Sequence, residues 1–292
     1  TAMLRSMEGA IANIANDLIG ALPDAVDVDM VKSLTIPLPV TVIARMMGIP
    51  AERSEDFKRW SDALTGTLTG LSLEDRRAEM LEMAAYFREL IPKRRAAPGN
   101  DLVSAVVNAQ IDGVGLSEWE IVGFNMLLLI AGNETTTNLL GNLLNVLIDR
   151  PDLWERLRAA PELIESAIEE ALRYDSPVQF VMRAATEDVR LYDQQIRKGD
   201  HVIVVMGSAN RDAAMSPDPD EFLIERARTR HLSFGYGIHF CIGAPLARIE
   251  ARIAMETLIG RVAKIDRGAA RPQRVASHLL RGFEALPLRL FR

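Results

Sequence analysis

The sequence contains very little cysteine, since Cys241 is the only one among 292 residues. A single cysteine excludes a disulfide within the chain, and it excludes an iron–sulfur cluster, which needs several thiolates. This cysteine usage is typical of a reducing compartment, so we expect a cytoplasmic protein. No flavin-binding motif is present either. If the chain carries out redox chemistry, its electrons must therefore come from a separate protein.

Long apolar runs, linkers and basic blocks are also missing. The most apolar segment, residues 121–131, is interrupted by Gly123 and Asn125, and it is shorter than the roughly 18 residues that suggest a membrane-spanning helix. No tract rich in proline, glycine and serine divides the chain, so we expect one domain over residues 1–292. Without a basic block or aromatic–basic interleaving, we expect no nucleic-acid binding.

The remaining composition is typical of a soluble globular protein, with 48% hydrophobic residues, 25% charged residues and a net charge of −6. Apolar residues at helical spacing predict helices over residues 3–19, 39–47, 52–64, 72–95, 101–109, 117–149, 151–159, 161–173 and 244–258. Strand signals cover residues 178–184, 189–191, 201–206, 279–283 and 286–290, with the second and third joined through a turn at 197–200. We therefore expect a mainly α-helical fold with a minor β-sheet.

The helix over residues 117–149 is the longest predicted element. Ser117 and Glu120 form a capping-box pattern at its start, and a helix of this length spans roughly 50 Å. Its middle breaks the apolar pattern, because Gly132 is followed by polar residues at 133–138. Glycine weakens a helix and threonine hydroxyls compete for its carbonyl groups, so we expect a local kink or an opened hydrogen bond. From this segment alone, a functional site and a helix that surfaces briefly into solvent are equally good explanations.

The surroundings of Cys241 set it apart from an ordinary lone cysteine, which is usually a small buried hydrophobe. Gly235 and Gly237 allow a tight loop with positive φ angles, and a helix begins at Ala244, just after the sulfur. The free N–H groups and the positive dipole at the start of that helix stabilise a thiolate, the form of cysteine that ligates iron. A bent loop that delivers one thiolate suits an axial haem ligand.

The whole loop matches a family pattern. It reads Phe234-Gly-x-Gly-x-His239-x-Cys241-x-Gly243-x-x-Leu246-Ala247-Arg248 and resembles the cysteine-ligand loop of the cytochrome P450 family, bacterial type. The resemblance implies that the cofactor is haem b and that Cys241 binds its iron. It also implies that His239 and Arg183 bind the haem propionates and that Phe234 packs beside the ring and the sulfur. The cofactor-binding residues implied in this way are Ala131, Arg183, Phe234, Gly235, His239 and Gly243.

Two further motifs match the same family in the expected order. Ala131-Gly132-x-Glu134-Thr135-Thr136 resembles its oxygen-activation motif, which implies that Glu134 and Thr135 are the catalytic acid–alcohol pair that relays protons. Glu170-x-x-Arg173 resembles its Glu-x-x-Arg signature, which implies a structural lock with Arg226 on the chain that leads to Cys241. The resemblance places the substrate pocket at Leu128, Leu129, Phe180, Val181, Leu279 and Leu280.

The resemblance implies a monooxygenase that uses dioxygen and two electrons to hydroxylate a small apolar substrate. The electrons would come from NAD(P)H through a ferredoxin reductase and a ferredoxin. A peroxide-dependent peroxygenase is an alternative, although it would not need the Glu134–Thr135 pair. A non-catalytic haem-binding fragment is another, because family members carry helices before the position of Thr1. We therefore expect a P450-like fold that lacks its N-terminal helices and retains haem weakly.

Overall fold

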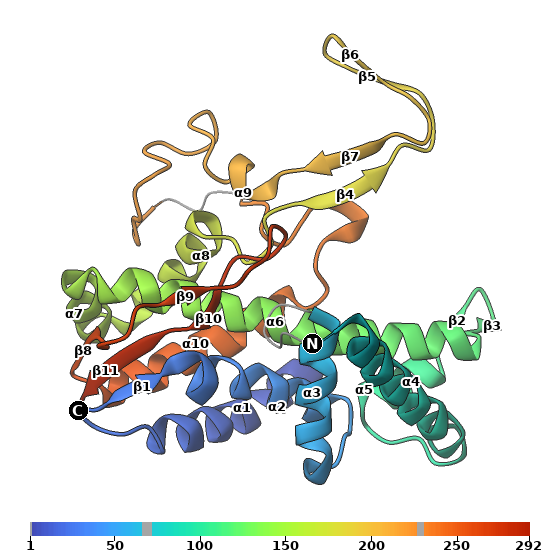
Figure 1. The fold of residues 1–292 in the computed structure, drawn as a ribbon, viewed down its shortest axis with the longest axis horizontal. Helices are drawn as coiled ribbons and strands as arrows, with labels where there is room; N and C mark the ends of the chain where they lie inside the picture. The colour runs from blue at the N-terminus through green and yellow to red at the C-terminus, as the bar shows by residue number, and fades with distance from the viewer. Residues whose placement is uncertain (1, 66–71, 227–230) are drawn as a thin grey trace.

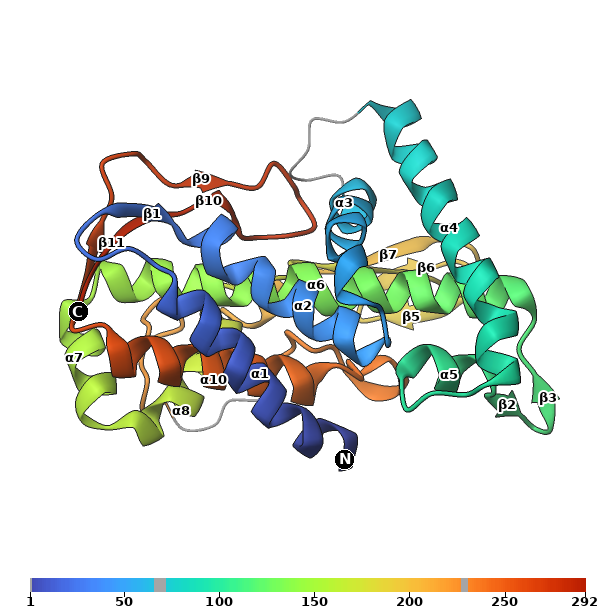
Figure 2. The same ribbon diagram turned by 90° about the horizontal axis from the view of Figure 1, so that it is seen from below.

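The helix α6 (Glu118–Ile148) is the central element of the computed structural model, which describes residues 2–65, 72–226 and 231–292. It runs along the long axis of the molecule (Figure 1 and Figure 2). The Ser117 hydroxyl accepts a hydrogen bond from the Glu120 amide, and the Glu120 carboxylate accepts one from the Ser117 amide. These bonds satisfy donors that a helix start leaves open. Both ends of the predicted helix are confirmed.

The chain before α6 is mainly helical. Its elements are α1 (Ala2–Gly20), β1 (Asp27–Asp29), η1 (Val31–Thr35), α2 (Pro37–Met46), η2 (Ala51–Arg53), α3 (Ser54–Thr65), α4 (Leu73–Ala96), α5 (Leu102–Val107), β2 (Gln110–Ile111) and β3 (Val114–Gly115). The helix α4 begins, as expected, at a capping box between Ser72 and Asp75. The helices α2, α3 and α4 all pack against α6, and α1 packs against the C-terminal helix α10 (Ala244–Arg261).

The chain after α6 carries the remaining helices and most of the strands. They are α7 (Pro151–Ala159), η3 (Pro161–Leu163), α8 (Ile164–Tyr174), β4 (Val181–Ala184), β5 (Val189–Leu191), β6 (Gln194–Ile196), β7 (His201–Val204), α9 (Met206–Ala209), η4 (Gly237–His239), β8 (Lys264–Arg267), β9 (Gln273–Arg274), β10 (Phe283–Ala285) and β11 (Pro287–Phe291). Within the described ranges, no helix combines the length and the apolar character needed to cross a bilayer.

The strands form small antiparallel sheets rather than one sheet. The largest has the order β1-β11-β8. The expected pairing of residues 189–191 with 201–206 is wrong, because β5 pairs with β6 and β7 returns along β4. Tyr192, at φ +54°, turns the chain back directly after β5. The strand β6 was not predicted, because it begins with two polar residues, Gln194 and Gln195, which do not fit an apolar strand pattern. The two hairpins project away from the helices (Figure 1).

Two hydrophobic clusters form the core, and α6 contributes to both. The C-terminal half of α6 packs with α1, α7, α8 and α10 through residues such as Leu139, Leu143 and Leu147. The N-terminal half packs with α3, α4 and α5 in a second cluster that contains Phe57 and Trp60. Each large apolar side chain buried in this way contributes about 1.5–3 kcal/mol. The polar middle of α6 therefore lies between two apolar cores.

Candidate active site

Cys241 lies in a tight loop that leads into α10. The Cys241 amide donates a 2.8 Å hydrogen bond to the Phe234 carbonyl oxygen, which closes the loop. Gly235 and Gly237 have φ angles of +73° and +68°, in the left-handed region that favours glycine. The sulfur lies 3.7 Å from the point that a Cβ on Gly243 would occupy, so it sits over the N-cap residue of α10. Cys241 is exposed.

Apolar side chains are exposed on the cysteine loop and on three other elements. Ile238 and Ile242, on either side of Cys241 in the sequence, are 98% and 86% exposed. On α6, Phe124 and Leu127 are exposed, and so are Met182 of β4 and Ile203 and Val204 of β7. Where exposed apolar side chains form a contiguous patch, they mark a binding site.

Two polar side chains offer donors beside this apolar surface. Arg183 on β4 is exposed, and among the described residues its guanidinium makes one hydrogen bond, to the Met182 carbonyl oxygen at 2.8 Å. Since a guanidinium has five N–H donors, most of them remain available for an anionic ligand. His239 in η4 is also exposed. Both side chains could bind carboxylate groups at the rim of a ligand.

The middle of α6 remains α-helical without a break, and the expected local kink or opened hydrogen bond stays a prediction. The Thr135 hydroxyl does donate a hydrogen bond to the Ala131 carbonyl oxygen, at 3.0 Å, but the helix continues through it. Close packing explains why residue 132 is glycine, because a Cβ there would lie 3.1 Å from the side chain of Ile43 in α2. Glycine at this position lets α2 approach α6 closely.

The polar residues that follow Gly132 are buried except for Thr135, which is partly buried, so the helix does not surface into solvent here. Glu134, Thr136 and Asn138 each expose less than a tenth of their surface. Asn133 donates a hydrogen bond to Ser61 of α3, and Thr137 donates one to the Thr35 carbonyl oxygen at 2.8 Å. These side chains connect α6 to its neighbours.

The comparison with known proteins identifies the molecule. A family model described as "Cytochrome P450" matches residues 40–262. The chain belongs to the cytochrome P450 family.

Several relatives and solved structures are similar over nearly the whole chain. Cytochrome P450 107B1 of Saccharopolyspora erythraea is 43% identical over 98% of this chain and 71% of that protein. The polyketide biosynthesis cytochrome P450 PksS of Bacillus subtilis is 39% identical over 98% of this chain and 71% of that protein. The structure of CYP109E1 from Bacillus megaterium in complex with testosterone has a TM-score of 0.90 at 42% identity, covering 99% of this chain and 80% of that one.

Membership in the P450 family establishes the reaction class. The chain is an oxidoreductase, a haem monooxygenase that uses dioxygen and a redox partner, and its cofactor is haem b. The family predicted from the sequence motifs and the mainly α-helical fold are both confirmed. The residues present fit the cofactor, because one exposed thiol, exposed apolar surface and the donors of Arg183 and His239 match iron, an apolar ring and its carboxylates.

The P450-type Glu-x-x-Arg pair is buried. Arg173 is 1% exposed and binds both oxygens of Glu170 at 2.8 Å. Arg226 donates to the same carboxylate at 3.0 Å. Arg173 also donates to the carbonyl oxygens of Pro219, at 2.8 Å, and Glu221, at 2.9 Å. The structure therefore brings the three predicted residues together and attaches to them the irregular chain that follows α9.

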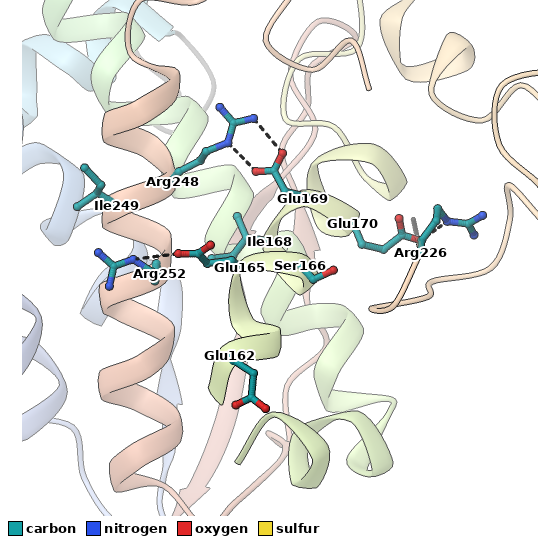
Figure 3. A pocket seen from close by; sticks show the side chains of 10 residues that line it. All are labelled: Glu162, Glu165, Ser166, Ile168, Glu169, Glu170, Arg226, Arg248, Ile249 and Arg252. Carbon is teal, nitrogen blue, oxygen red and sulfur yellow. Dashed lines mark hydrogen bonds and ion pairs between the residues drawn. The ribbon is translucent and has the colours of Figure 1, made fainter. Parts of the chain in front are cut away.

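A second ion pair links α8 to the cysteine loop and α10. Arg248 donates to both oxygens of Glu169, at 2.6 and 2.9 Å, and His231 Nε2 lies 3.1 Å from the same carboxylate. Burial raises the pKa of Glu169, but the hydrogen bonds from Arg248 and His231 outweigh it and lower the pKa to about 2. The Arg248 guanidinium also stacks on Phe234, 4.5 Å from the ring centre. Figure 3 shows Arg248 of α10 pointing toward Glu169 of α8.

A cavity of about 660 Å³ lies beside this pair, between α8 and α10. Charged side chains dominate its lining, including Glu162, Glu165, Arg226 and Arg252 (Figure 3). Several of these charges are paired with one another, since Arg226 binds Glu170 and Arg252 Nε lies 3.7 Å from Glu165. This polar lining differs from the exposed apolar side chains of α6, β4 and β7.

The predicted pocket residues divide into two groups. Leu128, Phe180, Val181 and Leu280 are partly buried, and Leu279 is 43% exposed, so all five keep accessible surface. Leu129 is 0% exposed and packs in the cluster with Phe57 and Trp60, so it offers no accessible surface to a ligand in this structure. One residue along a helix turns the side chain by about 100°. The exposed apolar side chains in this part of α6 are instead Phe124 and Leu127.

Glu250 on α10 is a buried acid that was not predicted from the sequence. It is 1% exposed, and neither of its carboxylate oxygens has a hydrogen-bond partner among the described residues. Burial raises the pKa of Glu250 to about 8, and the Thr136 hydroxyl opposes this only in part. The signal was available, because Glu250 lies one helical turn from buried Leu246 and from buried Ala254.

Proposed function

We propose that Cys241 is the iron ligand and that the chain inserts one oxygen atom of dioxygen into a C–H bond of an apolar substrate. The observation that carries this proposal is the exposed thiol of Cys241 over the N-cap of α10, on a loop with exposed apolar side chains. Iron is bound by the thiolate form of cysteine. When bound, haem supplies the redox chemistry that activates dioxygen.

The surrounding side chains would hold the cofactor and exclude water. Arg183 and His239 would donate hydrogen bonds to the propionates, and Phe234 would pack beside the sulfur, where the Arg248 guanidinium already fixes its ring. Gly235, Gly243 and Ala131 would let the cofactor approach the backbone, since each has a small side chain or none. The exposed apolar groups, including Phe124 and Leu127, would cover the ring and the substrate.

Thr135 and Glu134 would deliver the protons that the reaction consumes. A hydroxyl can accept a hydrogen bond while it donates one, and that of Thr135 now donates to the Ala131 carbonyl oxygen. By turning about its Cα–Cβ bond, it would give that proton to the site and take another from Glu134. The partial burial of Thr135 would keep bulk water from this path.

The substrate class and the electron source complete the proposal. The structure of CYP109E1 contains testosterone, and a relative that is 37% identical is named vitamin D(3) 25-hydroxylase, so apolar compounds are ligands of similar proteins. The single cysteine cannot hold a cluster, so the proposed electron donors are a ferredoxin and its NAD(P)H-dependent reductase.

The replacement Cys241→Ser tests the iron ligand. We expect the reduced, carbonyl-bound variant to lose the strongly red-shifted Soret band that thiolate ligation produces, because a serine hydroxyl gives iron much less electron density. The absorption spectrum of the wild type and of the variant is the measurement. A variant that keeps the red-shifted band would show that Cys241 is not the ligand.

The replacement Thr135→Ala tests the proton path. We expect haem and substrate binding to persist while reducing equivalents are diverted to hydrogen peroxide, so that product formed per NAD(P)H consumed falls by roughly tenfold or more. Thr135→Ser, which keeps the hydroxyl, is the matched control and should retain most of the coupling. Equal coupling in all three proteins would mean that another group delivers the protons.

A further inference from the structure

The loop between β9 and β10 carries Leu279 and Leu280, and it is attached to α6 at its two ends. Gly282 lies directly on α6, because a Cβ there would come within 1.7 Å of Asn138 Oδ1. Only glycine lets the loop approach the helix so closely. At the other end, Arg274 donates a 2.9 Å hydrogen bond to the side chain of Asn142.

Asn142 is the point where the loop, α6 and the end of α8 meet. It is 1% exposed, and its amide nitrogen donates to the carbonyl oxygens of Asp175 and Arg281, both at 2.9 Å. Its amide oxygen accepts the bond from Arg274. An amide has two donors and one carbonyl oxygen, so every polar atom of this side chain is used.

Asp175, the C-cap residue of α8, completes the arrangement. Its carboxylate is 9% exposed and binds the guanidinium groups of Arg274, at 3.2 Å, and Arg281. The buried carboxylate would be costly without a cation, whereas the side chains of Arg274 and Arg281 are 38% and 51% exposed, so the pairing secures Asp175 above all. We call Asn142, Asp175, Arg274 and Arg281 the clamp.

The clamp joins two segments of the proposed pocket that are far apart in the sequence. The Gln179 amide donates to the Leu279 carbonyl oxygen at 2.8 Å, and the Arg281 amide donates to the Pro177 carbonyl oxygen at 2.9 Å. Val178 and Leu280 form an isolated β-bridge between these bonds. Phe180 and Val181 follow directly, so their spacing from Leu279 is set by the chain that the clamp holds.

We propose that Asn142 and Asp175 are positioning residues for substrate specificity, because they fix the distance between the segment of Phe180 and Val181 and the loop of Leu279 and Leu280. Neither residue needs to touch the substrate. The inference rests on the proposed function, in which these apolar residues line the substrate site. A loss of the clamp would let the loop shift, and shifts of about 1 Å are enough to change how a bound molecule is oriented.

The experiment compares two ligands of haem iron that differ in size. Imidazole is small and reports on access to iron, whereas clotrimazole is a large apolar imidazole that must also fit the pocket walls. The ferric holoprotein is titrated spectroscopically with each ligand, for the wild type, Asn142→Leu and Asp175→Asn. We expect both variants to bind clotrimazole about tenfold more weakly, with the dissociation constant of imidazole changed by less than about twofold.

Asn125→Leu is the matched control. Asn125 is a buried amide of the same helix, and its nitrogen donates to the Ile121 carbonyl oxygen of its own turn, 2.8 Å away. We expect the ratio of the dissociation constants for clotrimazole and imidazole to be the same in Asn125→Leu as in the wild type. Hydrogen exchange adds a second measurement, since the amides of Gln179 and Arg281 should exchange faster in both clamp variants and at the wild-type rate in the control.

The possible outcomes are distinct. If the wild type binds imidazole but not clotrimazole, the proposed apolar pocket is wrong and this inference falls with it. If the wild type binds both ligands and the clamp variants keep the wild-type ratio, the apolar pocket stands and the positioning role alone is wrong. Asp175→Asn preserves the size of the side chain, so it decides the question even if Asn142→Leu does not fold.

Discussion

Two buried glutamates on neighbouring helices have opposite surroundings. Glu170 of α8 contacts the guanidinium groups of Arg173 and Arg226 and accepts a further hydrogen bond from the Leu223 amide at 2.9 Å. Glu250 of α10 is equally inaccessible, but no described residue satisfies its carboxylate. Glu170 is therefore a charged group that connects separate segments of the chain through its arginine partners. Glu250 has a pKa of about 8, so below that pH it is a neutral carboxylic acid.

The difference shows that burial alone does not determine what a carboxylate contributes. A buried charge is tolerated where partners replace the lost water, and otherwise the group binds a proton. The two glutamates therefore should respond to the same replacement, glutamate to glutamine, with changes of stability in opposite directions.

Glu170→Gln should destabilise the protein by about 3–5 kcal/mol or prevent its folding, because it leaves two inward-facing guanidinium groups without their anion. Chemical unfolding of the holoprotein, compared with the wild type, measures the free energy. Asp152→Asn is the control, since the ion pair between Arg150 and Asp152 is exposed and should contribute about 0–1 kcal/mol. A loss from Glu170→Gln no larger than that of the control would remove the proposed structural role.

Glu250→Gln should stabilise the protein at alkaline pH. The pKa of Glu250 rises from 4.5 to about 8 on folding, so its contribution to stability is complete below pH 4.5 and is lost as the pH rises through 8. The wild type should therefore lose stability across this interval at a slope of up to about 1.4 kcal/mol per pH unit from this group.

Melting temperatures of both proteins, measured at several pH values between 5 and about 9, check the expectation. The curves should lie close together at pH 5 and separate as the pH rises, with the glutamine variant higher. Curves that stay parallel would contradict the expectation, because Glu250 would then have the same pKa in the folded and the unfolded chain. Glu250 would in that case not be the destabilising counterpart of Glu170.

Glu169→Gln should have the smallest effect of the three, because its side chain is 38% exposed and shares its charge with solvent. We expect a loss of about 0–1 kcal/mol at neutral pH. The pKa of Glu169 is lowered to about 2, so its contribution is present above pH 4.5 and disappears as the pH falls toward 2. Unfolding at pH 7 and pH 3 gives the measurement, and a loss that is larger at pH 3 than at pH 7 would contradict it.

The sequence was a good guide wherever a feature is local. Ser117 with Glu120 marks the start of α6, Pro151 marks the start of α7, and the loop of Gly235 and Gly237 marks the cysteine site. Each of these features is encoded within one or two turns of chain. The family and the reaction class followed because the cysteine motif is itself continuous in the sequence.

Features that depend on contacts between distant segments were not predicted. The pairing of β4 with β7 depends on which strand edge a hairpin meets, and the orientation of Leu129 depends on which side of α6 the helices α3 and α4 cover. Asn142 and Arg281 lie 139 positions apart, so no local pattern relates them. Glu250 was missed because a glutamate on a helix is normally solvated.

The position of α6 in both hydrophobic clusters has a consequence for its length. The leucines of its C-terminal half and Ile121, Val122 and Leu129 of its N-terminal half face different partners. One residue inserted between them would rotate one half against the other by about 100°, whereas four residues would restore the register to within a fraction of a turn. Substitutions in this segment exchange one side chain, but a change in the number of residues would misalign a whole core. The spacing of α6 is thus a structural constraint in its own right, independent of which residues occupy it.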